Sequence, residues 1–396
     1  MTNSNTEIQF KSEIPFYRDE RVIKAVAQIL SAVLVIGFVI WGVINFQRAA
    51  EARGMSLGFD FLDKPAGFPI SNPPIEYDPS MSFGRAFVVG LVNTLLVSIS
   101  GIFVATILGT LLALARLSSN WLLSRLALVY IEFHRNIPLL VLLFIWYFTV
   151  FAKLPPVKES ITWTSVAYLN QRGIYLTWPR LTDAGHTFVI PFMIGIILAI
   201  ISFVTLRKRR ELTGKDTYYV PISLGLLVIG TMIGLAVSGW KPFWLDQPVL
   251  EGFNFQGGLR LTPEFAALFV GLSTYTAAFI AEVVRAGIQA VDRGQMEAAR
   301  ALGLNTVQVL SLVVMPQALR VIIPPMISQY LNLTKNSSLA LVIGFQEVFS
   351  VGKIAINQAG RAVPVFALVM LTYLALSLLT SFVLNLYNRR IQFVTR

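Results

Sequence analysis

Two pairs of opposite charges lie inside long apolar stretches of this chain, where an ionisable side chain is costly and is therefore a candidate for function. Glu132 and Arg135 are three residues apart in one stretch, and Glu282 and Arg285 have the same spacing at the end of another. Side chains three apart share one face of a helix, so each pair can also neutralise itself across a helical turn. The sequence leaves both interpretations open, a functional charge and a self-compensating pair.

A denser polar group surrounds Lys335 inside another apolar stretch. Its neighbours Asn332, Asn336, Ser337 and Ser338 all carry hydrogen-bonding side chains. Such a cluster is expected to face water, a bound solute or another subunit rather than lipid. The ammonium of Lys335 could bind a carboxylate with help from these amides and hydroxyls, which predicts a solute pathway; a polar contact between subunits is the alternative. Weaker candidates for the same pathway are Thr274, Tyr275 and Thr276.

Signatures of covalent chemistry are absent from the sequence. It contains no cysteine, and its two histidines, His134 and His186, are far apart, so neither a disulfide nor a metal site is expected. No paired carboxylates and no nucleophile beside a base suggest an enzyme. The phosphate-binding pattern G-x-x-x-x-G-K-[S/T] is also missing, since the pair Gly214-Lys215 is followed by Asp216. We therefore expect the chain to bind no cofactor and no ATP itself.

The composition places the chain in a membrane. Hydrophobic residues make up 55% and charged residues only 13%, which a soluble protein cannot usually bury. Several apolar runs are long enough to span the hydrocarbon layer as helices. The net charge of +11 could suggest nucleic acid, but the basic residues cluster at the ends of these runs, as the positive-inside rule explains. The expected fold class is an all-α polytopic membrane protein that does not bind nucleic acid.

Eight membrane-spanning segments are expected. They are approximately Val22–Phe46, Arg85–Ala115, Leu126–Phe151, Thr187–Leu206, Tyr218–Gly239, Pro263–Val284, Ile323–Phe345 and Val363–Tyr387. The corresponding regions are a terminus at 1–21, a first helix at 22–46, a Pro-rich loop at 47–84, helices at 85–151, a segment with two loops and two helices at 152–262, helices at 263–387 around a polar loop at 285–322, and a terminus at 388–396. Glycine and alanine recur every fourth residue at Gly101, Ala105 and Gly109, and Gly230, Gly234 and Ser238 repeat the spacing, which predicts close helix packing.

Charge asymmetry predicts the orientation. The run from Arg207 to Arg210 and nearby Lys215 fill one short loop, which should therefore be cytoplasmic. Alternation then makes both termini and the 285–322 loop cytoplasmic, and the long loops after the first, third and fifth spans periplasmic. The first span, flanked by Arg18, is interpreted as an uncleaved anchor; a signal peptide cleaved near Ala50-Glu51-Ala52 is the alternative, although the apolar region is long for one.

The polar loop between the sixth and seventh spans has its own helix signals. Asp292 can cap a short helix, and Gly303 can end it in the left-handed conformation. Asn305 and Gln308 have capping-box spacing for a second helix, which Pro316 is expected to stop. The result is a helix-turn-helix at the membrane surface. A DNA-binding role is excluded because the second helix is largely apolar and lies beside two spans; an ordinary loop is the other alternative.

This loop resembles the EAA loop of ATP-binding-cassette (ABC) import permeases, through Glu297, Ala298, Ala299, Gly303 and Pro316. Four further segments resemble the polar amino-acid permeases of the histidine-importer type: GLVNTL from Gly90, YIEFHRNIPLL from Tyr130, AEVVRAGI from Ala281 and KNSSL from Lys335. The resemblance covers essentially the whole chain and is strongest to the long general L-amino-acid permease subunits, which carry an added first helix and an insert between core helices. One departure is Asn136-Ile137, where shorter relatives often have Gly-Thr.

The resemblance implies a type I importer permease of the methionine-importer kind, with a five-helix core formed by the second, third, sixth, seventh and eighth spans. It implies that the loop rests on an ABC ATPase dimer, which binds ATP and magnesium. It also implies a second homologous permease subunit, a periplasmic amino-acid-binding protein and residence in the bacterial inner membrane among its lipids. The expected function is import of polar or general L-amino acids, such as Glu, Gln, Asp and Asn, by alternating access.

An ion-coupled secondary amino-acid transporter is the alternative function. The absence of an inverted repeat in the sequence and the helix signals of the EAA-like loop both argue against it. A membrane-embedded enzyme is remote, because no catalytic constellation is present.

Overall fold

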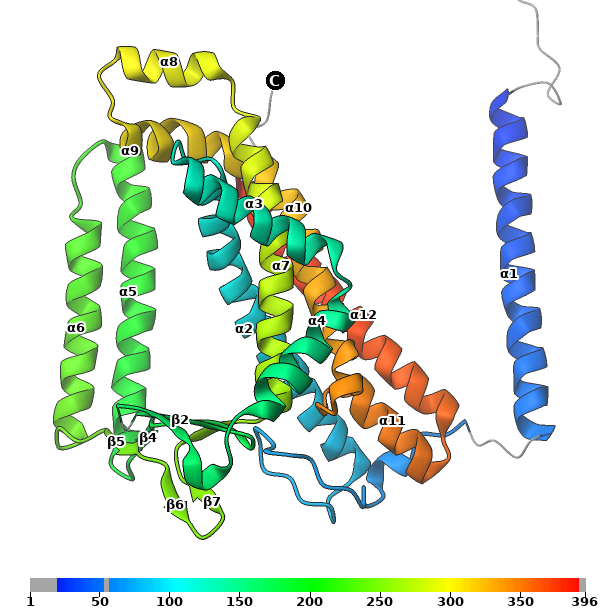
Figure 1. The fold of residues 1–396 in the computed structure, drawn as a ribbon. Helices are drawn as coiled ribbons and strands as arrows, with labels where there is room; N and C mark the ends of the chain where they lie inside the picture. The colour runs from blue at the N-terminus through cyan, green and yellow to red at the C-terminus, as the bar shows by residue number, and fades with distance from the viewer. Residues whose placement is uncertain (1–19, 53–56, 165, 392–396) are drawn as a thin grey trace, which may run out of the picture.

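The computed structural model describes residues 20–52, 57–164 and 166–391, which form long helices joined at one end by a small strand-rich region (Figure 1). The long helices are α1 (Glu20–Ala52), α2 (Phe83–Arg116), α3 (Trp121–Asn136), α5 (Gly185–Thr213), α6 (Tyr219–Val237), α7 (Pro263–Gln289), α10 (Met315–Asn336) and α12 (Ala362–Ile391). Shorter helices are α4 (Leu139–Phe144), α8 (Arg293–Ala301), α9 (Thr306–Gln308) and α11 (Val348–Ala359). The π-helices are η3 (Ile145–Val150) and η6 (Val309–Val314), and the 3-10 helices are η2 (Asp60–Asp63), η4 (Phe151–Lys153), η5 (Val157–Glu159) and η7 (Ser337–Ile343).

The number of spans agrees with the sequence prediction. Among the described residues, seven helices are long and apolar enough to cross a membrane, or eight if the bent pair beginning with α3 counts as one span. Helix α1 runs on to Ala52, so the Pro-rich loop starts later than predicted. None of the most apolar part of α1 is buried, and Figure 1 shows it apart from the other helices. Of the predicted terminal segments 1–21 and 388–396, residues 1–19, with Arg18, and residues 392–396 lie outside the described residues.

Helices α2, α7 and α10 form the core. Leu268, Leu272 and Ile280 of α7 are fully buried. A Cβ atom added at Gly109 of α2 would lie only 2.6 Å from the side chain of Ile280, so a larger residue would force the two helices apart. Ala105, one turn earlier, is also fully buried. The small residues of α2 therefore serve close packing, as their spacing predicted.

The third predicted span, Leu126–Phe151, is a bent pair of helices rather than one straight helix. Helix α3 ends at Asn136, and the chain restarts at Leu139 with a bend of 105°. Ile137 between them is extended, with φ −102° and ψ 131°. The cause is Pro138, because the proline ring disfavours the helical conformation of the residue before it and lacks an N–H donor.

Helices α5 and α6 form an antiparallel hairpin that packs mainly on itself. A Cβ atom added at Gly230 would lie 2.6 Å from the Cα atom of Gly195, so the backbones touch at that point. Gly234 makes a similarly close approach to Phe188. Figure 1 shows the hairpin beside the core rather than inside it. Most of its large apolar side chains, such as Ile190 and Ile194, are consequently exposed to the surroundings.

Short antiparallel strands fill the two segments that the sequence predicted as plain loops. They are β1 (Ile161–Trp163), β2 (Ala167–Asn170), β3 (Gly173–Leu176), β4 (Trp178–Leu181), β5 (Phe243–Asp246), β6 (Val249–Glu251), β7 (Asn254–Gln256) and β8 (Leu259–Leu261). The sheets are β1-β2-β3-β8, β4-β5 and β6-β7. Tyr175 pairs with Arg260 across β3 and β8, so the segments before and after the α5–α6 hairpin are joined. Such pairing between distant segments leaves no local signal in the sequence.

The Pro-rich loop is an ordered part of the fold between residues 57 and 82. Phe61 and Phe68 are buried against α2, α11 and α12. The amide of Gln346, just before α11, bonds the loop twice: its Oε1 accepts from the N–H of Ser71 at 2.7 Å, and its Nε2 donates to the carbonyl of Pro69 at 2.9 Å. The loop therefore fixes the position of α11.

Figure 1 shows two distinct ends of the molecule. Helix α8, the connection between α5 and α6, and the C-terminal end of α12 lie at one end. The strands and the Pro-rich loop lie at the other. The segments that the charge rule assigned to one membrane side thus lie together, whereas the identity of that side remains a prediction.

Candidate functional site

Helix α8 begins and ends at the predicted signals. The Oδ1 atom of Asp292 accepts a hydrogen bond from the N–H of Gly294 at 2.6 Å, which caps the first turn. At the other end the N–H of Leu304 donates to the carbonyl of Ala299 at 3.2 Å. Gly303 between them has φ +80°, the left-handed conformation that a glycine adopts without strain. Short-range hydrogen bonds therefore define this helix and its turn.

The second helix of the loop also begins as predicted but ends elsewhere. Asn305 and Gln308 exchange two hydrogen bonds, at 2.9 Å and 3.0 Å, and form a complete capping box. Pro316 does not stop the helix, so this prediction was wrong. The helical path continues through residues 306–343, with π-helix η6 just before Pro316. In the first turn of an α-helix the backbone N–H groups have no α-helical carbonyl acceptor. A proline there, which lacks the N–H, therefore removes no α-helical hydrogen bond.

Helix α8 has one inward and one outward face. Ala299 is buried and Met296 half-buried against the core helices. Glu297 and Ala298 face outward and are exposed. Four of the five residues of the EAA-like pattern, Glu297, Ala298, Gly303 and Pro316, are exposed and thus accessible to another protein, whereas Ala299 is buried.

An apolar surface surrounds the turn after α8. The relative exposures of Leu302 and Val307 are 82% and 74%, and Leu312 is 65% exposed. Leu302 directly follows α8, Val307 lies in α9, and Leu312 lies in η6, at the start of the helical segment 306–343. We call Leu302, Val307 and Leu312 the turn surface. Large apolar side chains exposed beside the outward polar face of α8 are typical of an interaction site.

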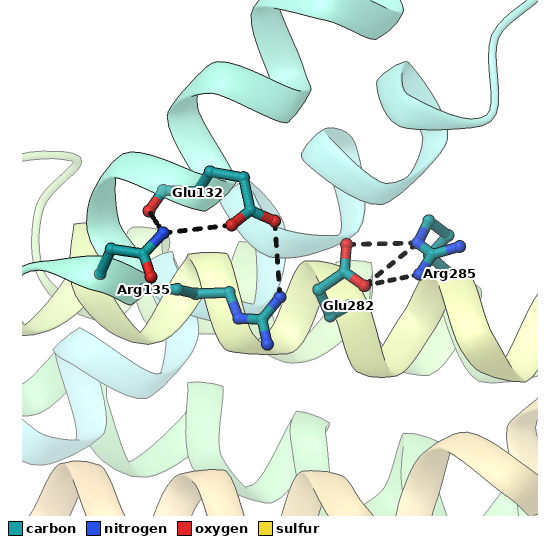
Figure 2. Close-up of polar contacts among 5 residues, drawn as sticks. Glu132, Arg135, Glu282 and Arg285 are labelled. Atoms are coloured by element: carbon teal, nitrogen blue, oxygen red, sulfur yellow. Dashed lines mark hydrogen bonds and ion pairs between the residues drawn. The ribbon is translucent and has the colours of Figure 1, made fainter.

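The two Glu–Arg pairs come from neighbouring helices, α3 and α7 (Figure 2). The guanidinium of Arg285 forms a close forked contact with Glu282, whose nearest N–O distance is 2.6 Å. Glu132 and Arg135 are looser, at 3.8 Å and more exposed. Arg135 also lies over the ring of Phe279 on α7, 5.9 Å from its centre. The geometry supports the interpretation that each pair compensates itself within one turn, while Arg135 adds a link between α3 and α7.

The residues around Lys335 do not share one surface. Asn332 and Lys335 are exposed on the same side of α10, close to its C-terminal end. Ser337 is fully buried, and its hydroxyl donates to the carbonyl of Thr334 at 2.7 Å. Ser338 is half-buried and donates to the carbonyl of Lys335 at 2.8 Å. Asn336 is also half-buried. In this conformation only Asn332 and Lys335 present freely accessible polar groups.

Lys335 has no compensating charge among the residues that the structure describes. Within the described ranges its ammonium forms neither a hydrogen bond nor an ion pair. An exposed cation on a helix of a candidate membrane span needs an anionic or aqueous partner. The position therefore remains a candidate for a solute or subunit contact.

The weaker candidates on α7 are engaged in helix packing. Thr276 is buried, and the ring of Tyr275 lies 4.9 Å from that of Phe279. The hydroxyl of Thr274 donates to a carbonyl of its own helix, and its carbonyl accepts from the hydroxyl of Tyr130 on α3 at 3.0 Å. No hydrogen bond links these residues to Lys335 in the part of the chain that the structure describes.

A buried carboxylate, Glu347, was not singled out from the sequence. It caps α11 by accepting from the N–H groups of Ser350 at 2.8 Å and Phe349 at 3.0 Å. It also accepts a short hydrogen bond from the hydroxyl of Tyr373 on α12. The only sequence signal is a single acidic residue inside an apolar run, three positions before a serine. The contacts show that this residue joins α11 to α12.

No group of three or more potential metal ligands is found among the described residues. The expectation that the chain itself binds no cofactor stays a prediction.

Comparison with known proteins gives consistent matches. Residues 217–393 match the family model described as "Binding-protein-dependent transport system inner membrane component". YhdX of Escherichia coli (strain K12), whose name places it among amino-acid ABC transporter permeases, is 45% identical over 93% of this chain and 94% of its own. The general L-amino acid transport system permease protein AapQ of Rhizobium johnstonii is 44% identical, over 93% of this chain and 92% of its own. BztB of Rhodobacter capsulatus, a glutamate/glutamine/aspartate/asparagine transport system permease protein, is 39% identical over 96% of both chains.

Proposed function

The chain belongs to the binding-protein-dependent transport system inner membrane components, among the amino-acid ABC transporter permeases, and on this premise we propose that it imports L-amino acids. It has the α-helical membrane fold of that family, with α2, the α3–α4 pair, α7, α10 and α12 as its five-helix core. The relatives that it matches support general or polar amino acids as the solutes. They also favour this function over an ion-coupled transporter.

The observation that carries the proposal is the turn surface beside α8. A permease that hydrolyses no ATP must receive mechanical work from a partner through an exposed contact. Leu302 and Val307 are almost fully exposed, and Glu297 lies outward on the adjoining helix. We assign the ATPase contact to Glu297, Ala298 and the turn surface. Gly303 shapes the turn between them, the buried Ala299 holds α8 against the core, and the exposed Pro316 lies just after η6 at the start of α10.

The same assignment gives the chain a direction. The ATPase is cytoplasmic, so the end with α8 is the cytoplasmic end, together with the α5–α6 connection and the end of α12 (Figure 1). The strands and the Pro-rich loop are then periplasmic and face the binding protein. The five basic residues of the segment 207–215 agree with this orientation.

The solute pathway is proposed along the exposed side of α10. Asn332 and Lys335 lie on this side with no counter-charge in the described residues. The carboxylate common to all amino acids would be the partner of Lys335, and the amide of Asn332 would add a hydrogen bond. A second, homologous permease subunit would close the other side of the pathway. Asn336 and Ser338, half-buried, would border it, whereas Ser337, Tyr275 and Thr276 support its helices.

The test of the ATPase contact uses reconstituted complexes. We expect Leu302→Asp and Glu297→Lys to reduce both retention of the ATPase subunit and its stimulation by substrate-loaded binding protein. Insertion into the membrane should be normal, because both side chains are exposed. Leu212→Asp is the matched control: Leu212 is also exposed, 77%, at the same end of the molecule but outside the loop.

Normal retention and normal stimulation in both variants would show that the turn surface is not the ATPase contact. Amino-acid uptake by the isolated chain in proteoliposomes, without any ATPase, would instead establish the ion-coupled alternative.

A further inference from the structure

The α5–α6 hairpin carries an apolar groove on its lipid-exposed side. The groove has a volume of about 300 Å³ and lies between the two helices, lined by Ala199, Phe203, Leu224 and Leu227 among others. Almost no polar surface lines it. The neighbouring faces of the hairpin are apolar and exposed, so the groove opens toward hydrocarbon rather than toward water.

A polar pocket of about 490 Å³ lies at the end of the same hairpin. Arg207, Arg210, Glu211, Gly214 and Tyr219 line it. Arg207 is paired with Glu211 at 3.1 Å, and the guanidinium of Arg210 lies 5.6 Å above the ring of Tyr219. These contacts hold the two arginines in place while leaving N–H donors on each unused.

The electrostatics of this end favour an anion. Between positions 207 and 216 there are five basic residues and two acidic ones. The second acidic residue, Asp216, is only 3.9 Å from Arg210, at the limit of an ion pair. Excess positive charge at a helix end beside the membrane surface attracts anionic headgroups.

The groove and the pocket adjoin each other. Phe203 of the groove is one helical turn before Arg207 of the pocket, and Val220 of the groove follows Tyr219 directly. The rings of Phe203 and Tyr219 are in edge contact, 5.2 Å apart, at the boundary. A ligand that fills both must have an apolar chain attached to an anionic head.

We propose that this composite site binds an anionic phospholipid, with its phosphate at Arg207 and Arg210 and an acyl chain in the groove. Charge complementarity selects the anionic headgroup, and the apolar groove selects a lipid over free phosphate. The bound lipid would pack against the α5–α6 hairpin, which otherwise packs mainly on itself, and would hold the hairpin at the membrane surface. The inference does not depend on the transported solute.

The test is native mass spectrometry of the full-length protein released from nanodiscs containing equal amounts of phosphatidylglycerol and phosphatidylcholine. We expect phosphatidylglycerol to be retained preferentially. The variant Arg207→Gln/Arg210→Gln should lower its retention at least about tenfold, because two charge-assisted contacts are lost. The control Lys208→Gln/Arg209→Gln removes the same charge from residues that do not line the pocket, and should retain most of the lipid.

A second arm separates the lipid from free phosphate. Ala199→Trp fills the groove without changing charge, and should lower phosphatidylglycerol retention; Ile194→Trp, at an exposed position of α5 outside the groove, is its control. Equal losses in the two charge variants would mean non-specific attraction and would overturn the site. Full displacement of the lipid by millimolar inorganic phosphate, together with no effect of Ala199→Trp, would identify an inorganic anion site instead.

Discussion

A substitution at Gly303 tests the turn after α8, and its free-energy cost follows from the φ angle of this residue. Its φ is +80°, and a Cβ atom added there would meet no other atom within 4 Å. The cost of Gly303→Ala is therefore conformational alone, about 1–2 kcal/mol for an L residue in the left-handed region. That corresponds to a factor of about 5 to 30 in the population of the correctly formed turn. Asparagine tolerates this region better, so Gly303→Asn should lose less.

The assay is ATP hydrolysis stimulated by substrate-loaded binding protein in proteoliposomes. We expect the stimulated rate to fall in the order glycine, asparagine, alanine, with an unchanged amount of inserted protein. Gly303→Trp adds bulk on the proposed ATPase side and should abolish uptake. Gly239→Ala is the matched control. Gly239 also has a positive φ, +63°, and free space around it, but it follows the C-terminal end of α6, far from α8. The same loss in Gly239→Ala, or no loss in Gly303→Ala, would refute the role of this turn.

Three further outcomes are expected. Lys335→Met or Asn332→Leu should weaken uptake of every amino acid with little change in selectivity. Wild-type uptake with normal assembly would exclude a pathway role for these residues. Loss of assembly with the second permease would indicate a subunit contact. Glu347→Leu should lower the thermal unfolding temperature strongly, because four buried or part-buried donors lose their acceptor at roughly 1–3 kcal/mol each, whereas Glu347→Gln should be milder. Gly230→Leu should separate α5 from α6, at a cost of about 1–3 kcal/mol, and make the segment 214–218 more sensitive to protease; unchanged cleavage would contradict the packing.

The features that could be predicted from the sequence are those whose cause is local. Asp292, Gly303, Asn305 and Gln308 form hydrogen bonds or turns within three or four residues, and the structure has them as expected. The spans were identifiable because a long apolar run needs no partner to be recognised. Close packing at Gly109 followed from spacing alone.

The features that were missed depend on context. Pro138 breaks a span, whereas Pro316 is accommodated beside a π-helix, although the same residue type is present at both. The pairing of Tyr175 with Arg260 joins segments 85 residues apart in the chain, and neither strand is long enough to be identified alone. The separation of buried Ser337 from exposed Lys335 depends on which side of α10 meets the core. These outcomes are decided by tertiary packing, which one sequence does not display.

The π-helix η6 lies between α9 and α10, where a change in its helix type would shift the helical register of α10. A π-helical turn holds one residue more than an α-helical turn. Conversion of η6 into α-helix would advance α10 by one residue relative to α9, a screw motion of about 100° and 1.5 Å. Such a motion would swing Asn332 and Lys335 away from their present exposed side while most backbone hydrogen bonds stay formed. Displacement at α8 could therefore be transmitted as rotation along one continuous helix, without a hinge.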